Sequence, residues 1–467
     1  MMKALWSVEE ILSATGGEAR GLDPATRIGS VSIDSRDIAP GALFVAIQGD
    51  RFDGHDFVAK ALDAGAAAAL VCRNRADALG EDGLIVVSDP LDGLRDLGEA
   101  ARERSRAQIV AVTGSVGKTT TKEAIRTVLS AAGETHASIK SFNNHWGVPL
   151  TLARLPRSAQ FGVFEIGMNH AGEIGPLSEM VRPHVAVITA IAPAHLEMLG
   201  SIEAIARAKA EIYSGLEPGG TAVINADHGQ LDILLKEAEA AEVGSVITYG
   251  FSERAEWRIL SCEILAGTTR ASIAHAGDEF TLTLNVPGRH MAANALAALI
   301  VAHLSGVERP VALEALAGFS AGEGRGAARL LGSGEKKLLL IDESYNANTA
   351  SMQAAMDVFA AQAAPGGRKV LVLGDMLELG AEGPAMHAAL AGHVRATGAE
   401  AVFLVGPAMS ALAEALGEAH VTLHVSGVDE VVEPVLNALA YGDAVMIKGS
   451  NGVRLAGLVH EIRGRFS

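Results

Sequence analysis

The chain has 467 residues, of which 49% are hydrophobic, 20% are charged and only 4% are aromatic, a composition typical of globular proteins. Its formal net charge of −17 argues against a nucleic-acid or anionic-membrane binder, because both functions need a basic surface. Two cysteines are too few for a disulfide framework or a clustered metal site. The N-terminus lacks the pattern of a secretory signal, and no apolar run is long enough to span a bilayer. We therefore expect a soluble cytoplasmic protein of about three domains.

The first predicted domain covers residues 1–105. It contains short strand-like runs separated by turn residues and a predicted helix at His55–Ala64, which follows the turn Asp53-Gly54. The charged segment Arg102–Arg106 is interpreted as a helix end or a linker. This pattern predicts a small α/β domain.

The second predicted domain covers residues 106–320. Its strand-like runs end at Val112, Ile166, Ile191 and Asn225, with helical patterns between them. This alternation predicts a mostly parallel sheet covered by helices.

The third predicted domain covers residues 321–467 and follows the glycine-rich linker at 318–329. Strand candidates alternate with helical segments of roughly 12–16 residues, which predicts a Rossmann-like doubly wound sheet. The fold class is therefore α/β, in three domains.

The stretch VAVTGSVGKTTT, residues 110–121, has the context of a phosphate loop, because an apolar strand leads through glycines into a helix. The first glycine of the standard motif is missing, since Val112 occupies its place. Backbone N–H groups at a helix N-terminus still favour an anion. We predict an ATPase-like nucleotide site, in which Lys118 contacts the β- and γ-phosphates and Thr119 ligates Mg²⁺. The alternative is a glycine-rich loop that only caps a helix.

Two further polar residues are expected near this loop, and a lysine stands out on a later helix. Glu165 and His195 follow apolar strands, and ligands of open α/β sheets bind beyond the carboxyl ends of the strands. A glutamate and a histidine beside a triphosphate suit a second divalent cation. Lys209 lies on the apolar stripe of a helix that Ser201 is expected to cap. Structural alternatives are a buried paired carboxylate for Glu165, a helix cap for His195 and a snorkelling side chain for Lys209.

The segment TGSVGKTT resembles the shortened phosphate loop of the Mur ligase family, which includes folylpolyglutamate synthases. The resemblance implies ATP as cofactor, two Mg²⁺ sites and a carbamylated Lys209 within the motif AKAEI. The implied roles are catalytic for Lys118, Lys209 and His195, and metal-binding for Thr119, Glu165, His195 and Lys209. It assigns the nucleotide to the loop residues Gly114, Ser115, Val116, Gly117, Lys118, Thr119 and Thr120.

Later motifs of the same family extend the implied nucleotide site. PGRHMAANALAA places Asn294 at the adenine, although Met291 replaces the family's first asparagine. The pair Gly324-Arg325 is similar to the family's G-R, with Arg329 as a competing arginine. The loop DESYNAN implies nucleotide contacts from Asp342, Tyr345 and Asn346; an Asx-rich helix cap is the structural alternative.

Motifs for the other substrates point to one branch of the family, the one that adds D-alanyl-D-alanine. DESYNAN, GDMLELG and IKGSN resemble that branch, with Asn451 in place of the usual arginine and Arg454 three residues later. The implied substrates are UDP-N-acetylmuramoyl-tripeptide and D-alanyl-D-alanine, which the enzyme would join through an acyl-phosphate intermediate. We expect the protein to be a monomer. The implied substrate-binding residues are Ser35, Arg36, Asn143, Asn144, Asn348 and Lys448.

Three alternatives remain open. A sister ligase that adds a single amino acid is disfavoured by the loop at 345–348 and by the lack of a D-N-P-R motif. A GTPase-like switch would need an N-K-x-D motif, and the sequence contains no Asn-Lys pair. A non-catalytic homologue is disfavoured by the intact Lys118, Thr119, Glu165 and His195.

Overall fold

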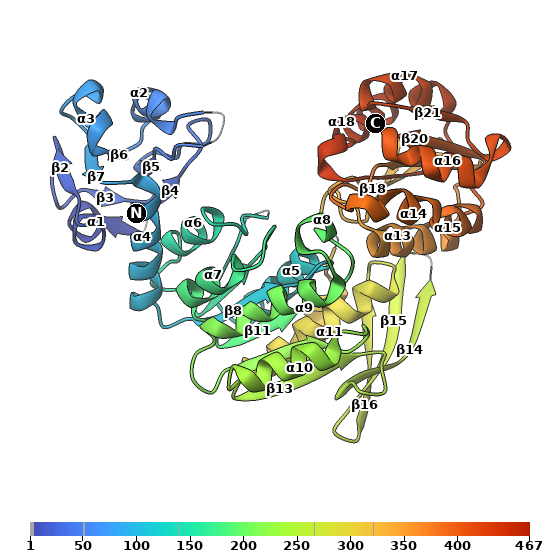
Figure 1. Ribbon diagram of the computed structural model, residues 1–467, viewed down its shortest axis with the longest axis horizontal. Helices are drawn as coiled ribbons and strands as arrows, with labels where there is room; N and C mark the ends of the chain where they lie inside the picture. Colours follow the sequence, from blue (N-terminus) through green and yellow to red (C-terminus); the bar gives the residue numbers. More distant parts are fainter. Residues whose placement is uncertain (1–3, 50–51, 140, 266, 321) are drawn as a thin grey trace.

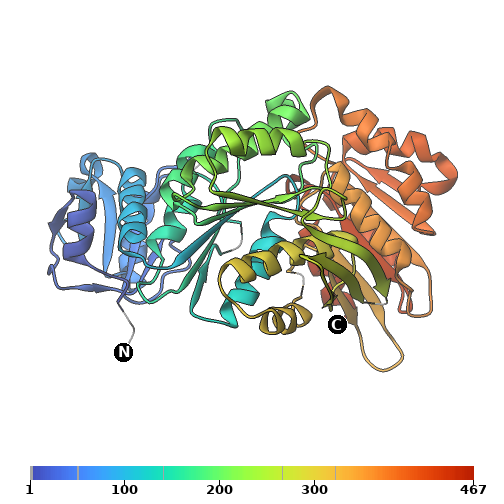
Figure 2. The same ribbon diagram turned by 90° about the horizontal axis from the view of Figure 1, so that it is seen from below.

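Three large sheets and one two-stranded sheet organise the chain. The computed structural model describes residues 4–49, 52–139, 141–265, 267–320 and 322–467. Figure 1 shows the N-terminal part (blue) and the C-terminal part (orange and red) on either side of a central part. Figure 2, seen from below, shows the three parts in a row in chain order.

The N-terminal part holds a five-stranded sheet of order β2-β7-β6-β5-β4, parallel except for β2. Its strands are β2 (Glu18–Arg20), β4 (Ser30–Ser32), β5 (Ala42–Val45), β6 (Ala68–Cys72) and β7 (Leu84–Val87), beside the pair β1 (Trp6–Ser7) and β3 (Arg27–Ile28). Its helices are α1 (Val8–Thr15), η1 (Gly54–Phe57), α2 (Val58–Asp63) and α3 (Arg73–Leu79). The predicted helix at His55–Ala64 is thus a 3₁₀ turn that continues into α2. α4 (Pro90–Arg104) then leads to the central part.

The central sheet has the order β16-β15-β14-β13-β12-β11-β8-β10-β9. Its strands are β8 (Gln108–Thr113), β9 (Thr135–Ala137), β10 (Phe161–Glu165), β11 (Val185–Ile188), β12 (Thr221–Asn225), β13 (Ser245–Gly250), β14 (Trp257–Leu265), β15 (Thr268–His275) and β16 (Asp278–Leu284). The run from β9 to β14 is parallel, which confirms the mostly parallel sheet. The antiparallel β15 and β16 were not foreseen, and β11 ends three residues before the predicted Ile191.

Helices cover both faces of the central sheet. One face carries α5 (Lys118–Ser130), α11 (Arg289–Leu304) and α12 (Arg309–Ala317), and the other carries α6 (Gly147–Ala153), α7 (Ile174–Val181), α9 (Ile202–Ala210) and α10 (Leu231–Ala240). α11 is buried over most of its circumference, as expected for a helix that is apolar on all sides. Two short helices, α8 (Leu196–Leu199) and η2 (Glu211–Gly215), flank α9.

The C-terminal sheet has the order β17-β18-β22-β19-β20-β21 and is parallel except for β17, which confirms the Rossmann-like arrangement. Its strands are β17 (Ala327–Leu331), β18 (Leu338–Glu343), β19 (Lys369–Gly374), β20 (Ala401–Val405), β21 (Leu423–Val425) and β22 (Ala444–Lys448). Its helices are α13 (Thr349–Ala361), η3 (Gly380–Glu382), α14 (Gly383–Ala388), α15 (Ala391–Ala396), η4 (Pro407–Met409), α16 (Ser410–Leu416), η5 (Glu418–His420), α17 (Val428–Ala438), η6 (Asn451–Val453) and α18 (Ala456–Phe466).

Apolar clusters lie on both faces of the central and C-terminal sheets. Across the described ranges, no helix is both long and apolar enough to cross a bilayer.

Candidate active site

The phosphate loop runs from β8 to the first residue of α5, Lys118. Gly114 and Gly117 have φ angles of 144° and 89°, in the region that favours glycine. A Cβ on Gly114 would lie 1.9 Å from Thr189 Oγ1, and a Cβ on Gly117 would lie 2.7 Å from Asn294 Oδ1. Both glycines are therefore required by backbone conformation and by close neighbours.

Neighbouring backbone and side chains hold the loop in place. The Ser115 N–H donates to the Ala190 carbonyl over 2.8 Å, and Thr189 Oγ1 donates to the Val116 carbonyl over 2.6 Å. Lys118 Nζ donates to the Gly114 carbonyl over 2.6 Å. Burial lowers the pKa of the Lys118 amine, and the Glu165 carboxylate partly opposes this shift. The loop is therefore preorganised, and the Lys118 amine lies across it, bonded to the Gly114 carbonyl.

Polar side chains from three segments meet at the start of α5. Thr119 Oγ1 donates to Glu165 Oε2 over 2.7 Å, and Asn143 Nδ2 donates to Glu165 Oε1 over 2.7 Å. Ser141 Oγ lies 3.3 Å from Thr119 Oγ1 and accepts a 3.0 Å hydrogen bond from Arg325 Nη2. The network joins the central sheet to an arginine of the C-terminal part.

These residues line a cavity of about 620 Å³ between the central and C-terminal parts. Most of the predicted site residues line it: Ser115, Val116, Gly117, Lys118, Thr119, Thr120, Asn143, Asn144, Glu165, His195, Asn294, Arg325, Tyr345, Asn346, Asn348 and Lys448. Five predicted residues are not part of this lining: Gly114, Lys209, Asp342, Ser35 and Arg36.

The C-terminal part contributes a cationic and aromatic wall. The Arg325 guanidinium lies 3.9 Å from the centre of the Tyr345 ring. Lys448 is buried, and its Nζ lies 3.2 Å from Glu343 Oε2 and donates to the Asn346 carbonyl over 3.0 Å. The competing Arg329 pairs instead with Glu323 over 2.9 Å, so Arg325 is the arginine that reaches the cavity.

Asp342 and Arg36, two of the predicted residues outside this lining, form hydrogen bonds elsewhere. The Asp342 carboxylate accepts hydrogen bonds from the Gly324 N–H and from Ser344, so it shapes the loop rather than facing the cavity. Arg36 is exposed and forms a two-point ion pair with Asp34 in the N-terminal part. The exposed Arg454 lies near Asn451 and outside the lining.

Lys209 is 1% exposed on α9, whose N-terminus is capped by Ser201 as predicted. Burial lowers the pKa of its amine well below the usual value, and the nearby Lys118 lowers it further. Within the described ranges its amine has no hydrogen-bond or ion-pair partner. It is therefore a buried amine that favours the neutral form.

His195 lies at the end of the segment that follows β11, in a left-handed backbone conformation with φ of 56°. Its Nδ1 lies 2.5 Å from Glu378 Oε2, on the loop that follows β19. The hydrogen bond holds the pKa of the Glu378 carboxyl below its usual range. Sequence reasoning placed His195 at the site but missed Glu378.

One wall of the cavity was missed altogether: Asn225, Asp227, His228, Phe251, Arg289 and His290. Arg289 stacks 3.9 Å from the centre of the Phe251 ring. Both ring nitrogens of His228 are buried without a hydrogen-bond partner among the described residues, and burial lowers the pKa of its imidazole to about 4. Two sequence signals pointed here: the position of 225–228 at the end of β12, at the same sheet edge as the phosphate loop, and the motif PGRHMAANALAA, which contains Arg289 and His290.

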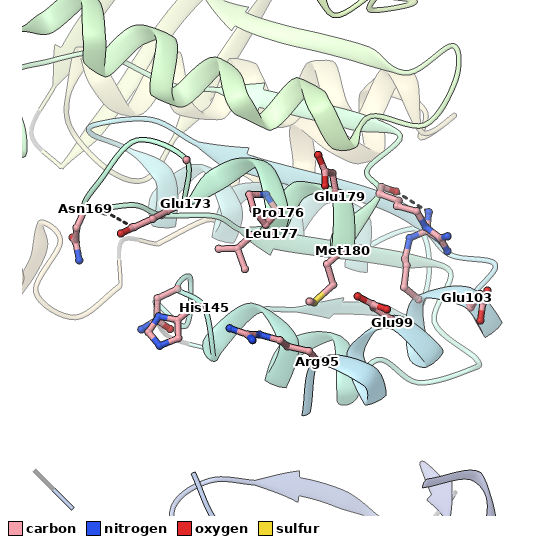
Figure 3. A pocket seen from close by; sticks show the side chains of 15 residues that line it. Arg95, Glu99, Glu103, His145, Asn169, Glu173, Pro176, Leu177, Glu179 and Met180 are labelled. Carbon is pink, nitrogen blue, oxygen red and sulfur yellow. Dashed lines mark hydrogen bonds between the residues drawn. The ribbon is translucent and has the colours of Figure 1, made fainter. Parts of the chain in front are cut away.

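A second cavity of about 1040 Å³ lies between α4 and α7. Figure 3 shows Arg95, Glu99 and Glu103 along α4, facing Leu177 and Met180 of α7. It shares Asn144, Gly167, Asn169 and Glu173 with the first cavity. The two cavities are therefore adjacent and have these four lining residues in common.

The sequence matches three family models over most of its length. These are "Mur ligase family, catalytic domain" at residues 27–124, "Mur ligase middle domain" at residues 112–302 and "Mur ligase, glutamate ligase domain" at residues 329–451. The UDP-N-acetylmuramoyl-tripeptide–D-alanyl-D-alanine ligase of Escherichia coli is 37% identical over 420 residues, which cover 88% of each chain. The chain belongs to the Mur ligase family.

Solved structures of Mur ligases have the same fold. MurF from Acinetobacter baumannii matches with a TM-score of 0.84 and 30% identity, over 99% of each chain. MurF from Thermotoga maritima in complex with ADP matches with a TM-score of 0.76 and 25% identity, over 94% of this chain and 97% of that one. Both similarities span all three sheets, as expected for the three-part fold of Mur ligases.

The Mur ligase cavity offers donors that suit Mg²⁺. No ready-made cluster of three or more His, Cys, Asp or Glu side chains occurs in the described part of the chain. Mg²⁺ commonly binds through one or two carboxylates together with substrate phosphates and water. The Thr119 and Glu165 oxygens, 2.7 Å apart at the phosphate loop, fit that mode of binding.

Proposed function

We propose that this Mur ligase is an ATP-dependent, ADP-forming enzyme that joins D-alanyl-D-alanine to UDP-N-acetylmuramoyl-tripeptide in peptidoglycan precursor synthesis. The observation that carries the proposal is the cavity between the central and C-terminal parts, where the phosphate loop faces Arg325, Tyr345–Asn348 and Lys448. Relatives named UDP-N-acetylmuramoyl-tripeptide–D-alanyl-D-alanine ligase match nearly the whole chain, which supports the same substrates here.

The chemistry begins at the phosphate loop. The terminal carboxylate of the tripeptide attacks the γ-phosphorus of ATP and forms an acyl phosphate and ADP. Backbone N–H groups of the loop and the Lys118 amine neutralise the charge that develops on the transferred phosphoryl group. The Arg325 guanidinium reaches the same cavity from the C-terminal part and adds a second positive charge.

Amide-bond formation follows. The amine of D-alanyl-D-alanine attacks the acyl carbon, and phosphate leaves from the tetrahedral intermediate. The C-terminal wall, with Asn346, Asn348 and Lys448, is the proposed site for the dipeptide. Because the site draws on two parts of the chain, domain closure would bring the reactants together and exclude water.

Divalent cations complete the proposed chemistry. When bound, Mg²⁺ neutralises the phosphate oxygens and orients them for transfer. Thr119 would hold one ion, and Glu165, His195 and a carbamylated Lys209 would hold the second. The buried Lys209 amine supports carbamylation, since a neutral amine reacts with CO₂ and its depressed pKa favours that form.

The UDP-sugar is proposed to bind across the N-terminal part. Ser35 and Arg36 would contact the UDP-sugar, and Asn143 and Asn144 would contact the muramoyl-peptide portion. Asn144 also lines the cavity between α4 and α7, which extends the space available to the peptide. We assign residues 1–105, 106–320 and 321–467 to the UDP-sugar, ATP and ligase domains, each built around one large sheet. The monomeric state and the cytoplasmic location stay predictions.

Phosphate release from ATP tests the proposal. It should require UDP-N-acetylmuramoyl-tripeptide and D-alanyl-D-alanine together. Release with a single amino acid and a shorter UDP-muramoyl peptide would instead identify a sister ligase. Release that needs neither substrate would contradict both assignments.

A further inference from the structure

One residue of the central part and one of the C-terminal part meet beside the cavity. His195 Nδ1 lies 2.5 Å from Glu378 Oε2, although 183 residues separate them in the sequence. The Glu197 N–H also donates to the Glu378 carbonyl over 3.3 Å. His195 precedes α8 and Glu378 precedes η3, and these two short helices are in contact. The contact joins the central and C-terminal parts.

The backbone of both residues is unusual. His195 and Glu378 have φ angles of 56° and 63°, and they are two of only six non-glycine residues with left-handed φ in the described part of the chain. Such conformations persist only where the surrounding structure fixes them, and they concentrate at functional sites. His195 and Glu378 both have this conformation and face each other across an interface. We infer that the surrounding structure holds both residues in place for this contact.

The hydrogen bond fixes the tautomer of a neutral imidazole. A carboxylate only accepts hydrogen bonds, so the proton of neutral His195 lies on Nδ1 and leaves the Nε2 lone pair free. Nε2 has no hydrogen-bond partner among the residues that the structure describes, and His195 lines the cavity. In metal sites, a carboxylate on one ring nitrogen commonly orients the other nitrogen toward the cation.

We propose that Glu378 is a positioning residue that holds His195 with Nε2 directed to a divalent cation, so that the C-terminal part completes the cation site. The inference rests on the proposed function, which places the second cation at His195. Its consequence is coupling: cation binding favours the closed arrangement, and closure strengthens cation binding by the same factor.

Mn²⁺ binding to the full-length protein tests this inference. The protein is saturated with a non-hydrolysable ATP analogue and titrated with Mn²⁺, and free Mn²⁺ is followed by electron paramagnetic resonance. Glu378→Gln should weaken the weaker class of sites about 10–100-fold and leave the tighter class unchanged, because an amide does not fix the tautomer. Glu378→Asp should restore part of the affinity. Glu382→Gln, on the same surface segment and exposed, is the matched control and should bind as the wild type does.

Turnover gives a second readout. The Mg²⁺ concentration for half-maximal rate should rise in Glu378→Gln, with kcat largely recovered at saturating Mg²⁺. In a His195→Ala background, Glu378→Gln should have no further effect on Mn²⁺ binding. Unchanged Mn²⁺ affinity in Glu378→Gln, or equal weakening of both classes, would overturn the inference. The titration needs neither UDP-sugar nor dipeptide, so wild-type phosphate release tests the proposed function separately.

Discussion

Asn294 lies against the backbone of Gly117, where a Cβ would come within 2.7 Å of its Oδ1. The contact brings the first buried turns of α11 onto the phosphate loop, so the residue expected at the adenine also limits the shape of the loop. Any side chain at Gly117 must displace that amide.

Gly117→Ala should therefore lose ATP binding. Gly219 provides a matched control, because its φ of 79° is close to the 89° of Gly117 and a Cβ there would meet nothing within 4 Å. Both alanine variants should lose about 1–2 kcal/mol of unfolding free energy from the left-handed backbone. Only Gly117→Ala should weaken nucleotide affinity in calorimetric titration; equal ATP affinity in the two variants would refute the close-approach argument.

Lys118→Ala should lower kcat about 10²–10³-fold, because one preorganised charge on the transferred phosphoryl group is removed. Thermal unfolding should change little, since the amine has only the Gly114 carbonyl as a hydrogen-bond partner within the described ranges. Lys236→Ala, an exposed lysine on α10, is the control. A kcat near that of the control would remove Lys118 from the proposed chemistry.

Lys209→Ala should abolish activity and regain part of it with millimolar formate or acetate. A short carboxylate can occupy the space of the missing carbamate, which an alanine cannot form. The measurement is the rate of phosphate release against carboxylate concentration. Full activity of Lys209→Ala without any addition would eliminate the carbamate.

His228 should make the protein acid-sensitive. Its folded pKa of about 4 lies below the unfolded value of about 6.5, so the unfolded state binds more protons between these values. Stability is therefore lost as the pH falls from 6.5 to 4, by on the order of 2–3 kcal/mol from this group. His228→Gln should show a smaller loss in urea unfolding at pH 7 and pH 4.5. An identical loss in both proteins would argue against a buried neutral imidazole.

The sequence allowed good prediction of the regular α/β alternation and of the phosphate loop. Parallel strands carry continuous apolar runs and the loop residues are local, so Lys118 and Thr119 could be placed from one segment. The antiparallel β15 and β16 were missed because they alternate buried with more exposed residues and lack the continuous apolar runs of the parallel strands, although the two-residue turn Ala276-Gly277 connects them.

Residues whose role depends on distant contacts were harder to predict. Glu378 lies 183 residues from His195, and only the fold brings them together. Asp342 was expected to contact the nucleotide; in the structure its carboxylate accepts hydrogen bonds from the Gly324 and Ser344 N–H groups and is not part of the cavity lining. Such competition between backbone donors and a ligand cannot be read from residue types alone.

Transfer of ¹⁸O tests the central claim most directly, which is that the phosphate loop serves to activate a carboxylate for amide-bond formation. UDP-N-acetylmuramoyl-tripeptide labelled with ¹⁸O in its terminal carboxylate is incubated with ATP, D-alanyl-D-alanine and the enzyme. One ¹⁸O atom per turnover should appear in the released phosphate, since the acyl oxygen leaves with it. Phosphate that carries no ¹⁸O while the peptide bond forms would contradict the account.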